Sequence, residues 1–133
     1  MPKTVINIPD APQPGGPYNQ AVVANGLVFV AGFGPRDPKT REILGDDIAA
    51  QTRITLRHIE SVLASHGLGL SDLVQVTAYL QDPARDKAAF NAAYAEVVPQ
   101  PWPARATIGA QLAGFLVELD AIAVDHSSEE PAA

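Results

Sequence analysis

The sequence predicts an α+β fold in which two helices pack on one face of a sheet. Extended apolar runs and two segments with helical spacing follow in the order strand, strand, strand, helix, strand, helix, strand, strand, with residues 73–80 as the strand between the helices. This order is typical of a mostly antiparallel or mixed sheet with helices on one side. The chain has 133 residues, enough for one domain with one core. Because the strands are almost continuously apolar, we expect another subunit to cover the second face of the sheet.

The N-terminal part of the chain predicts three strands. Residues 4–8 form a short extended run, and residues 9–17 are rich in proline and glycine, which is typical of a loop with a fixed shape. Residues 20–24 and 27–32 are predicted to form a hairpin, because the Asn25-Gly26 dipeptide between them favours a tight turn. The run 27–32 is apolar throughout, so we expect a central strand that is covered on both faces.

Each of the two predicted helices begins with an aspartate that can cap its free backbone N–H groups. Asp46 or Asp47 precedes the first helix, which extends to about Ser65. Asp82-Pro83 begins the second helix, which extends to about Val98 and has its proline in the favoured first turn.

The three histidines are dispersed along the chain. His58 lies off the apolar stripe of the first helix, so we expect it to face solvent. His66 falls at the end of that helix, and His126 lies near the C-terminus. Because the chain also lacks cysteine, this pattern favours neither a metal site nor a disulfide.

The last two predicted strands carry the charged residues of greatest interest. Side chains alternate along a strand, so Arg105 and Thr107 share one face. The final run, residues 115–124, places Glu118 and Asp120 on one face. A buried guanidinium is costly unless a carboxylate or an oxyanion meets it, so we take Arg105 and Glu118 as a chemical pair. Two interpretations stay open: a functional pocket, or a salt bridge that joins strands or subunits.

Composition excludes several classes of function. The net charge is −6 with a pI near 4.8, and the nine Lys and Arg residues are scattered, which argues against nucleic-acid binding. No run approaches the roughly 20 apolar residues of a membrane span, and the first residues do not resemble a signal peptide. We therefore expect a cytoplasmic protein with one domain over residues 1–125 and a polar, disordered tail over residues 126–133.

Several segments, spread over nearly the whole chain, together carry a family resemblance. In chain order they are Gly-Pro-Tyr-Asn-Gln at 16–20, Leu-Val-Phe-Val-Ala-Gly at 27–32, Gln51 with Thr52, Asn-Ala-Ala-Tyr at 91–94, Pro-Ala-Arg-Ala-Thr at 103–107 and Glu-Leu-Asp-Ala-Ile-Ala-Val at 118–124. The combination resembles the RidA (YjgF) family of reactive-intermediate deaminases. Its most specific part is the Pro-Ala-Arg segment followed by the Glu-x-x-Ala-x-Ala-Val segment.

The resemblance implies a fold, an assembly and an activity. The family fold is similar to that of chorismate mutase, and its members form homotrimers with a central β-barrel, helices outside and pockets between subunits. Members that carry the arginine hydrolyse enamines and imines of amino acids to 2-keto acids and ammonia. This chemistry uses no metal and no cofactor, so the implied partners are small imino and keto acids and further copies of the chain.

The resemblance also implies roles for individual residues. Arg105 would hold the substrate carboxylate through a two-pronged contact, and Glu118 would hold and polarise the attacking water. The implied substrate-binding residues are Tyr18, Ala31, Gly32, Phe33, Asn91 and Thr107.

The chain departs from the family pattern at three of these positions. Ala31 stands where typical members carry serine, Phe33 where many carry glutamine, and Thr107 where cysteine is common. Phe33 and Ala31 lead us to expect a graded preference for imines with apolar side chains. They also leave open a non-catalytic trimer that binds small carboxylates or protects proteins. A ribonuclease activity, attributed to certain relatives, is disfavoured by the acidic composition.

Overall fold

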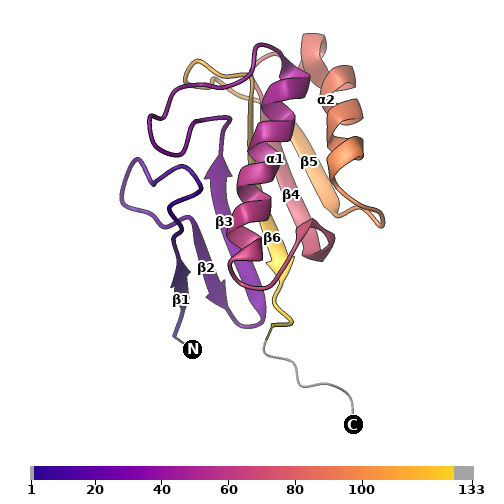
Figure 1. Ribbon diagram of the computed structural model, residues 1–133. Coiled ribbons are helices and arrows are strands. Elements are labelled where there is room, and N and C mark those ends of the chain that lie inside the picture. Colours follow the sequence, from indigo (N-terminus) through magenta and orange to yellow (C-terminus); the bar gives the residue numbers. More distant parts are fainter. Residues whose placement is uncertain (1, 128–133) are drawn as a thin grey trace.

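The computed structural model describes residues 2–127 and contains one mixed sheet with two helices on one of its faces (Figure 1). The strand order is β1-β2-β3-β6-β4-β5, and every neighbouring pair is antiparallel except β4 and β5. This confirms the predicted α+β class. The strands are β1 (Thr4–Ile6), β2 (Ala21–Ala24), β3 (Leu27–Phe33), β4 (Leu73–Leu80), β5 (Ala104–Gly109) and β6 (Val117–Val124).

The helices are α1 (Ile48–Ala64) and α2 (Pro83–Val97), with a short 3₁₀ helix, η1 (Leu70–Asp72), before β4. Both helices begin at the predicted aspartate caps. The carboxylate of Asp47 accepts a hydrogen bond from the backbone N–H of Ala50 at 2.8 Å. That of Asp82 accepts one from Arg85 at 3.1 Å, so each cap satisfies a backbone donor that the helix itself leaves free.

The core lies between the helices and the facing side of the sheet. Burial of each large apolar side chain contributes about 1.5–3 kcal/mol, which ties both helices to the strands. The side chains that are almost completely buried include Leu56, Ile59, Val62 and Leu63 of α1, Phe90 of α2, and Val28, Val76, Leu80 and Leu119 of the sheet.

The opposite face of the sheet has no helix over it (Figure 1). Phe29 of β3 is 42% exposed there, because its side chain points away from the buried Val28 and Val30 on either side. Ile108 at 48% and Val124 at 39% are also exposed. β3 is central, as predicted, but within one chain it is covered on one face only.

His58 contradicts the prediction that it faces solvent. It is 8% exposed, its Nε2 lies 2.8 Å from the carbonyl oxygen of Arg36, and its ring packs 6.3 Å from that of Phe33. Burial lowers the pKa of His58 below its ordinary value. The sequence pattern of one helix could not reveal that the loop after β3 supplies a polar partner.

The start of the predicted tail contacts the domain. His126 Nε2 lies 2.9 Å from a carboxylate oxygen of Asp72, and Ser127 contacts both Asp125 and His66. The rest of the tail, residues 128–133, lies outside the described residues. No helix within residues 2–127 has the length and apolar character needed to cross a membrane.

Candidate functional site

Arg105 lies on β5 and points toward α2. Its Nη2 donates a 2.6 Å hydrogen bond to Oδ1 of Asn91. The guanidinium carbon lies 4.7 Å from the centre of the Tyr94 ring and 5.1 Å from that of Phe90, so two aromatic rings contact the cation. Asn91 thus has the structural hydrogen bond that its position on the apolar face of α2 requires, and the arginine is held in place.

A cavity of about 340 Å³ lies beside this arginine. Tyr94 lines this cavity, and its hydroxyl is buried without a hydrogen-bond partner among residues 2–127. Burial raises the pKa of Tyr94, although the charge of Arg105 opposes the change. Thr107 lies two residues further along the same face of β5 and is half-buried. The cavity is lined by Asn91, Tyr94, Ala95, Trp102, Pro103 and Arg105.

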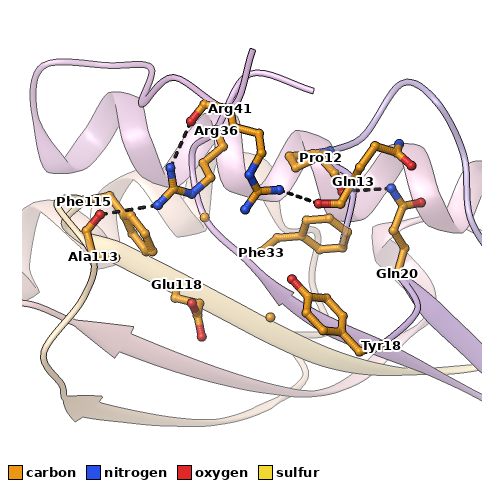
Figure 2. A pocket seen from close by; sticks show the side chains of 12 residues that line it. Pro12, Gln13, Tyr18, Gln20, Phe33, Arg36, Arg41, Ala113, Phe115 and Glu118 are labelled. Carbon is orange, nitrogen blue, oxygen red and sulfur yellow. Dashed lines mark hydrogen bonds between the residues drawn. The ribbon is translucent and has the colours of Figure 1, made fainter. Parts of the chain in front are cut away.

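Glu118 lines a second cavity, of about 230 Å³ (Figure 2). Its carboxylate has no hydrogen bond or ion pair to any side chain or backbone group within residues 2–127. Burial raises the pKa of Glu118 above its ordinary value, and the nearby charge of Asp120 raises it further. The cavity is lined by Pro12, Gln13, Tyr18, Gln20, Gly32, Phe33, Gly34, Arg36, Arg41, Ala113, Phe115 and Glu118.

Gly32 gives the Glu118 carboxylate its room. A Cβ atom built on Gly32 would lie 2.9 Å from Oε2 of Glu118, a distance that real Cβ atoms essentially never show. The absence of a side chain at position 32 therefore lets β3 approach the carboxylate closely. Ala31, beside it, contributes backbone: its N–H donates a 2.9 Å hydrogen bond to the carbonyl oxygen of Gln20.

The loop before β2 brings Tyr18 to the same cavity (Figure 2). Gln20 is buried and fixes this loop: its side chain accepts a hydrogen bond from the N–H of Ile8 at 2.7 Å and donates to the carbonyls of Ile8, Ala11 and Pro12. The Tyr18 side chain is half-exposed, and its hydroxyl accepts a 3.1 Å hydrogen bond from the N–H of Gly15. A phenol O–H donor thus faces the cavity from a loop of fixed shape.

Phe33 touches the cavity with very little of its surface. It is 4% exposed and packs against His58 in the core. A register shift between Val30 and Phe33 in the pairing of β3 with β6 accompanies this inward turn. The expected preference for apolar imine side chains relied on an exposed Phe33 ring, and the structure does not provide one.

Within one chain, Arg105 and Glu118 lie on opposite faces of the sheet. Arg105 pairs with Val76 of β4, which is buried beneath the helices, whereas Glu118 pairs with Tyr79, three residues further along β4. An odd separation along a strand puts the two side chains on different faces. A salt bridge between Arg105 and Glu118 of the same chain is therefore excluded, and the structure gives Arg105 a different partner, Asn91.

Two arginines of the Glu118 cavity were not predicted from the sequence. Arg36 and Arg41 belong to the polar loop after β3, and their side chains reach the cavity in Figure 2. The only signal in the sequence is the presence of two arginines in the loop that follows Gly34-Pro35, and a loop composition alone does not say where long side chains point.

Comparison with known proteins gives a consistent result. The family model described as endoribonuclease L-PSP matches residues 8–125. A RutC family protein from Pyrococcus horikoshii is 42% identical over 91% of this chain and 97% of its own length. The crystal structure of RidA from an Antarctic Psychrobacter is 28% identical with a TM-score of 0.84, covering 91% of this chain and 98% of its own. Escherichia coli TdcF with bound serine is 29% identical with a TM-score of 0.81, at the same coverage.

Proposed function

Because the chain belongs to the RidA/YjgF family, whose family model is described as endoribonuclease L-PSP, we propose that it hydrolyses 2-imino and 2-enamino acids to 2-keto acids and ammonia. The observation that carries the proposal is the Glu118 carboxylate, which lines a cavity without a cation partner among the described residues and has a raised pKa. A desolvated carboxyl in a cavity is suited to proton transfer near neutral pH.

The proposed active site joins Arg105 of one copy to the Glu118 cavity of a neighbouring copy. The two residues lie on opposite faces of one sheet, so a single chain cannot direct both at one small substrate. The apolar side chains exposed on the uncovered face, such as Phe29 and Ile108, support an assembly of several copies. We propose a homotrimer, which light scattering after gel filtration tests; a monomer at micromolar concentration contradicts it.

The proposed reaction uses side chains alone. Arg105 binds the substrate carboxylate with two parallel hydrogen bonds. Water held by Glu118 adds to the electrophilic carbon of the protonated imine while the carboxylate takes one proton from the water, which leaves a neutral amine on the tetrahedral intermediate. Transfer of that proton to nitrogen makes the amine of the tetrahedral intermediate a leaving group. Its departure as ammonia breaks the C–N bond, and loss of the hydroxyl proton leaves the keto acid.

A non-catalytic trimer that binds small carboxylates is the second candidate. Ala31 favours this candidate, because the alanine next to Gly32 has no side-chain hydroxyl that could hydrogen-bond a substrate. The serine bound to the related E. coli TdcF agrees with a site for small amino-acid-like molecules under either proposal.

A nucleic-acid substrate is disfavoured by the net charge of −6. We place the protein in the cytoplasm as part of the same proposal.

The direct test measures 2-keto acid release from imines generated in place by an amino-acid dehydratase or oxidase. We expect faster release with the protein than with buffer, across small and larger side chains. Release at the buffer rate, together with measurable binding of 2-keto acids, supports the carboxylate-binding trimer instead.

A further inference from the structure

Two guanidinium groups, those of Arg36 and Arg41, line the same cavity as Glu118 (Figure 2). Within residues 2–127, neither forms an ion pair with a carboxylate. The lining therefore carries two formal positive charges against the single negative charge of Glu118. In a chain with a net charge of −6, this is a local excess of positive charge at a concave site.

Arg36 is held firmly but keeps unused donors. Its Nη1 donates to the carbonyl of Arg41 at 2.9 Å, its Nη2 to that of Ala113 at 3.4 Å, and its guanidinium carbon lies 5.1 Å from the centre of the Phe115 ring. A guanidinium has five N–H donors, so an anion in the cavity can still receive hydrogen bonds from it.

The backbone at Arg41 adopts a conformation that L-residues rarely take. Its φ is +64°, in the left-handed region where glycine is the usual residue. The preceding turn is fixed by Asp37, whose carboxylate accepts from the N–H groups of Lys39 and Thr40 and whose carbonyl accepts from Arg41. From this position the Arg41 side chain reaches back over the cavity and donates to the carbonyl of Gln13. Unfavourable backbone geometry that presents a side chain to a cavity points to a functional role.

We propose that Arg36 and Arg41 form a subsite for a second anionic group, and that the preferred substrates are 2-imino acids with a carboxylate side chain. The inference rests on the proposed function, in which Arg105 of a neighbouring copy binds the first carboxylate. Under this proposal the reacting carbon lies between the two bound anionic groups, because Glu118 lines the same cavity as both loop arginines. The cavity of about 230 Å³ equals roughly eight water volumes, enough for a small dicarboxylate.

The test compares two imines of equal length that differ in charge. An amino-acid oxidase, with catalase present, produces the 2-imino acid from glutamate or from glutamine, and keto acid release gives kcat/KM for each. We expect the wild-type protein to favour the glutamate-derived imine by about tenfold, the effect of one charge-assisted hydrogen bond. The preference should shrink in high salt, because the exposed guanidinium of Arg41 is screened.

Arg41→Gly is the decisive variant, since glycine adopts the left-handed backbone of position 41 without strain. We expect its acid-to-amide ratio to fall toward one with no loss in melting temperature. Arg57→Ala removes the same charge from the exposed face of α1, where Arg57 pairs with Glu60, and should keep the wild-type ratio.

Each outcome decides the proposal. If both imines are hydrolysed with equal kcat/KM by the wild-type protein, the second subsite is wrong and the deaminase proposal stands. If no imine is hydrolysed, the deaminase proposal fails. The anion subsite is then tested by itself, by calorimetry that compares the binding affinities of 2-oxoglutarate and 2-oxobutanoate. Tighter binding of the dicarboxylate that disappears in Arg41→Gly supports the subsite, and equal binding overturns it.

Discussion

The two halves of the candidate site are built in opposite ways. On the helix side, the charge of Arg105 is already satisfied by Asn91 and by two aromatic rings. On the open side, Glu118 is partly desolvated and has no partner within residues 2–127. A group that only binds benefits from being fixed in advance, whereas a group that transfers protons benefits from a pKa moved toward neutral pH. The contrast supports the proposal that Arg105 binds the substrate and that Glu118 transfers the proton.

The largest expected effect comes from removing the charge of Glu118. Glu118→Gln should lower kcat by roughly 10²- to 10⁴-fold, the usual contribution of one positioned acid or base, with a smaller change in KM. Steady-state kinetics on one in-place imine gives both parameters. A variant with wild-type kcat contradicts the assignment of proton transfer to this half.

The same variant should be slightly more stable at pH 7 than the wild-type protein, by under about 1 kcal/mol for a half-exposed carboxyl. The raised pKa of Glu118 means that its ionised form is disfavoured in the folded state. This cost is absent below the unfolded-state pKa, where the carboxyl is protonated in both states, and it grows as the pH rises through the folded-state pKa. The stability difference between the proteins should therefore vanish at low pH in thermal unfolding.

Arg105→Lys tests the proposed binding role of Arg105. Lysine keeps the positive charge but loses the planar fork, the bond geometry to Asn91 and the stacking on Tyr94. We expect kcat/KM to fall by about 10²-fold, because a misplaced substrate reacts poorly, while the melting temperature and the assembled mass stay unchanged. If activity falls only in proportion to lost assembly, Arg105 serves the interface and not the substrate.

Gly32→Ala changes the surroundings of Glu118 without adding or removing a charged group. The added methyl would fall within about 3 Å of Oε2 of Glu118, so the carboxylate must move. We expect kcat to drop by about tenfold or more while Arg105-dependent binding of a 2-keto acid persists. Equal losses in kcat and in keto acid binding would mean that the roles of Arg105 in binding and of Glu118 in proton transfer cannot be separated.

The smallest effect concerns pH. The raised pKa of Glu118 predicts an acidic limb of the kcat/KM profile above pH 4.5, the ordinary value for this carboxyl. Asp120→Asn removes the second cause of the shift and keeps an acceptor for the hydroxyl of Tyr79. The limb should move to lower pH yet remain above 4.5, because burial, the larger cause, persists. If the acidic limb of Asp120→Asn lies at the same pH as that of the wild-type protein, a group other than Glu118 causes this limb.

The elements of the fold were predictable because their signals are local. The Asn25-Gly26 turn and the aspartate caps each depend on a few consecutive residues, and alternation correctly put Glu118 and Asp120 on one face of β6. The burial of His58 depends on a loop 22 residues away in the sequence.

The site was less predictable, since its geometry depends on pairing between distant strands. Alternation gives the faces within β5 and within β6, but their relation is fixed by the register of both strands on β4. For the same reason, nothing local revealed that Arg36 and Arg41 reach the Glu118 cavity.

The central claim is that one site uses Arg105 and Glu118 from different copies. The most direct measurement co-expresses Arg105→Lys and Glu118→Gln chains with different tags and isolates assemblies that carry both. In a cyclic trimer with both kinds of chain, one of the three junctions joins two unmodified halves, so we expect about one third of wild-type activity. Activity no higher than the sum of the two separate variants, in a folded mixed assembly, would contradict the claim.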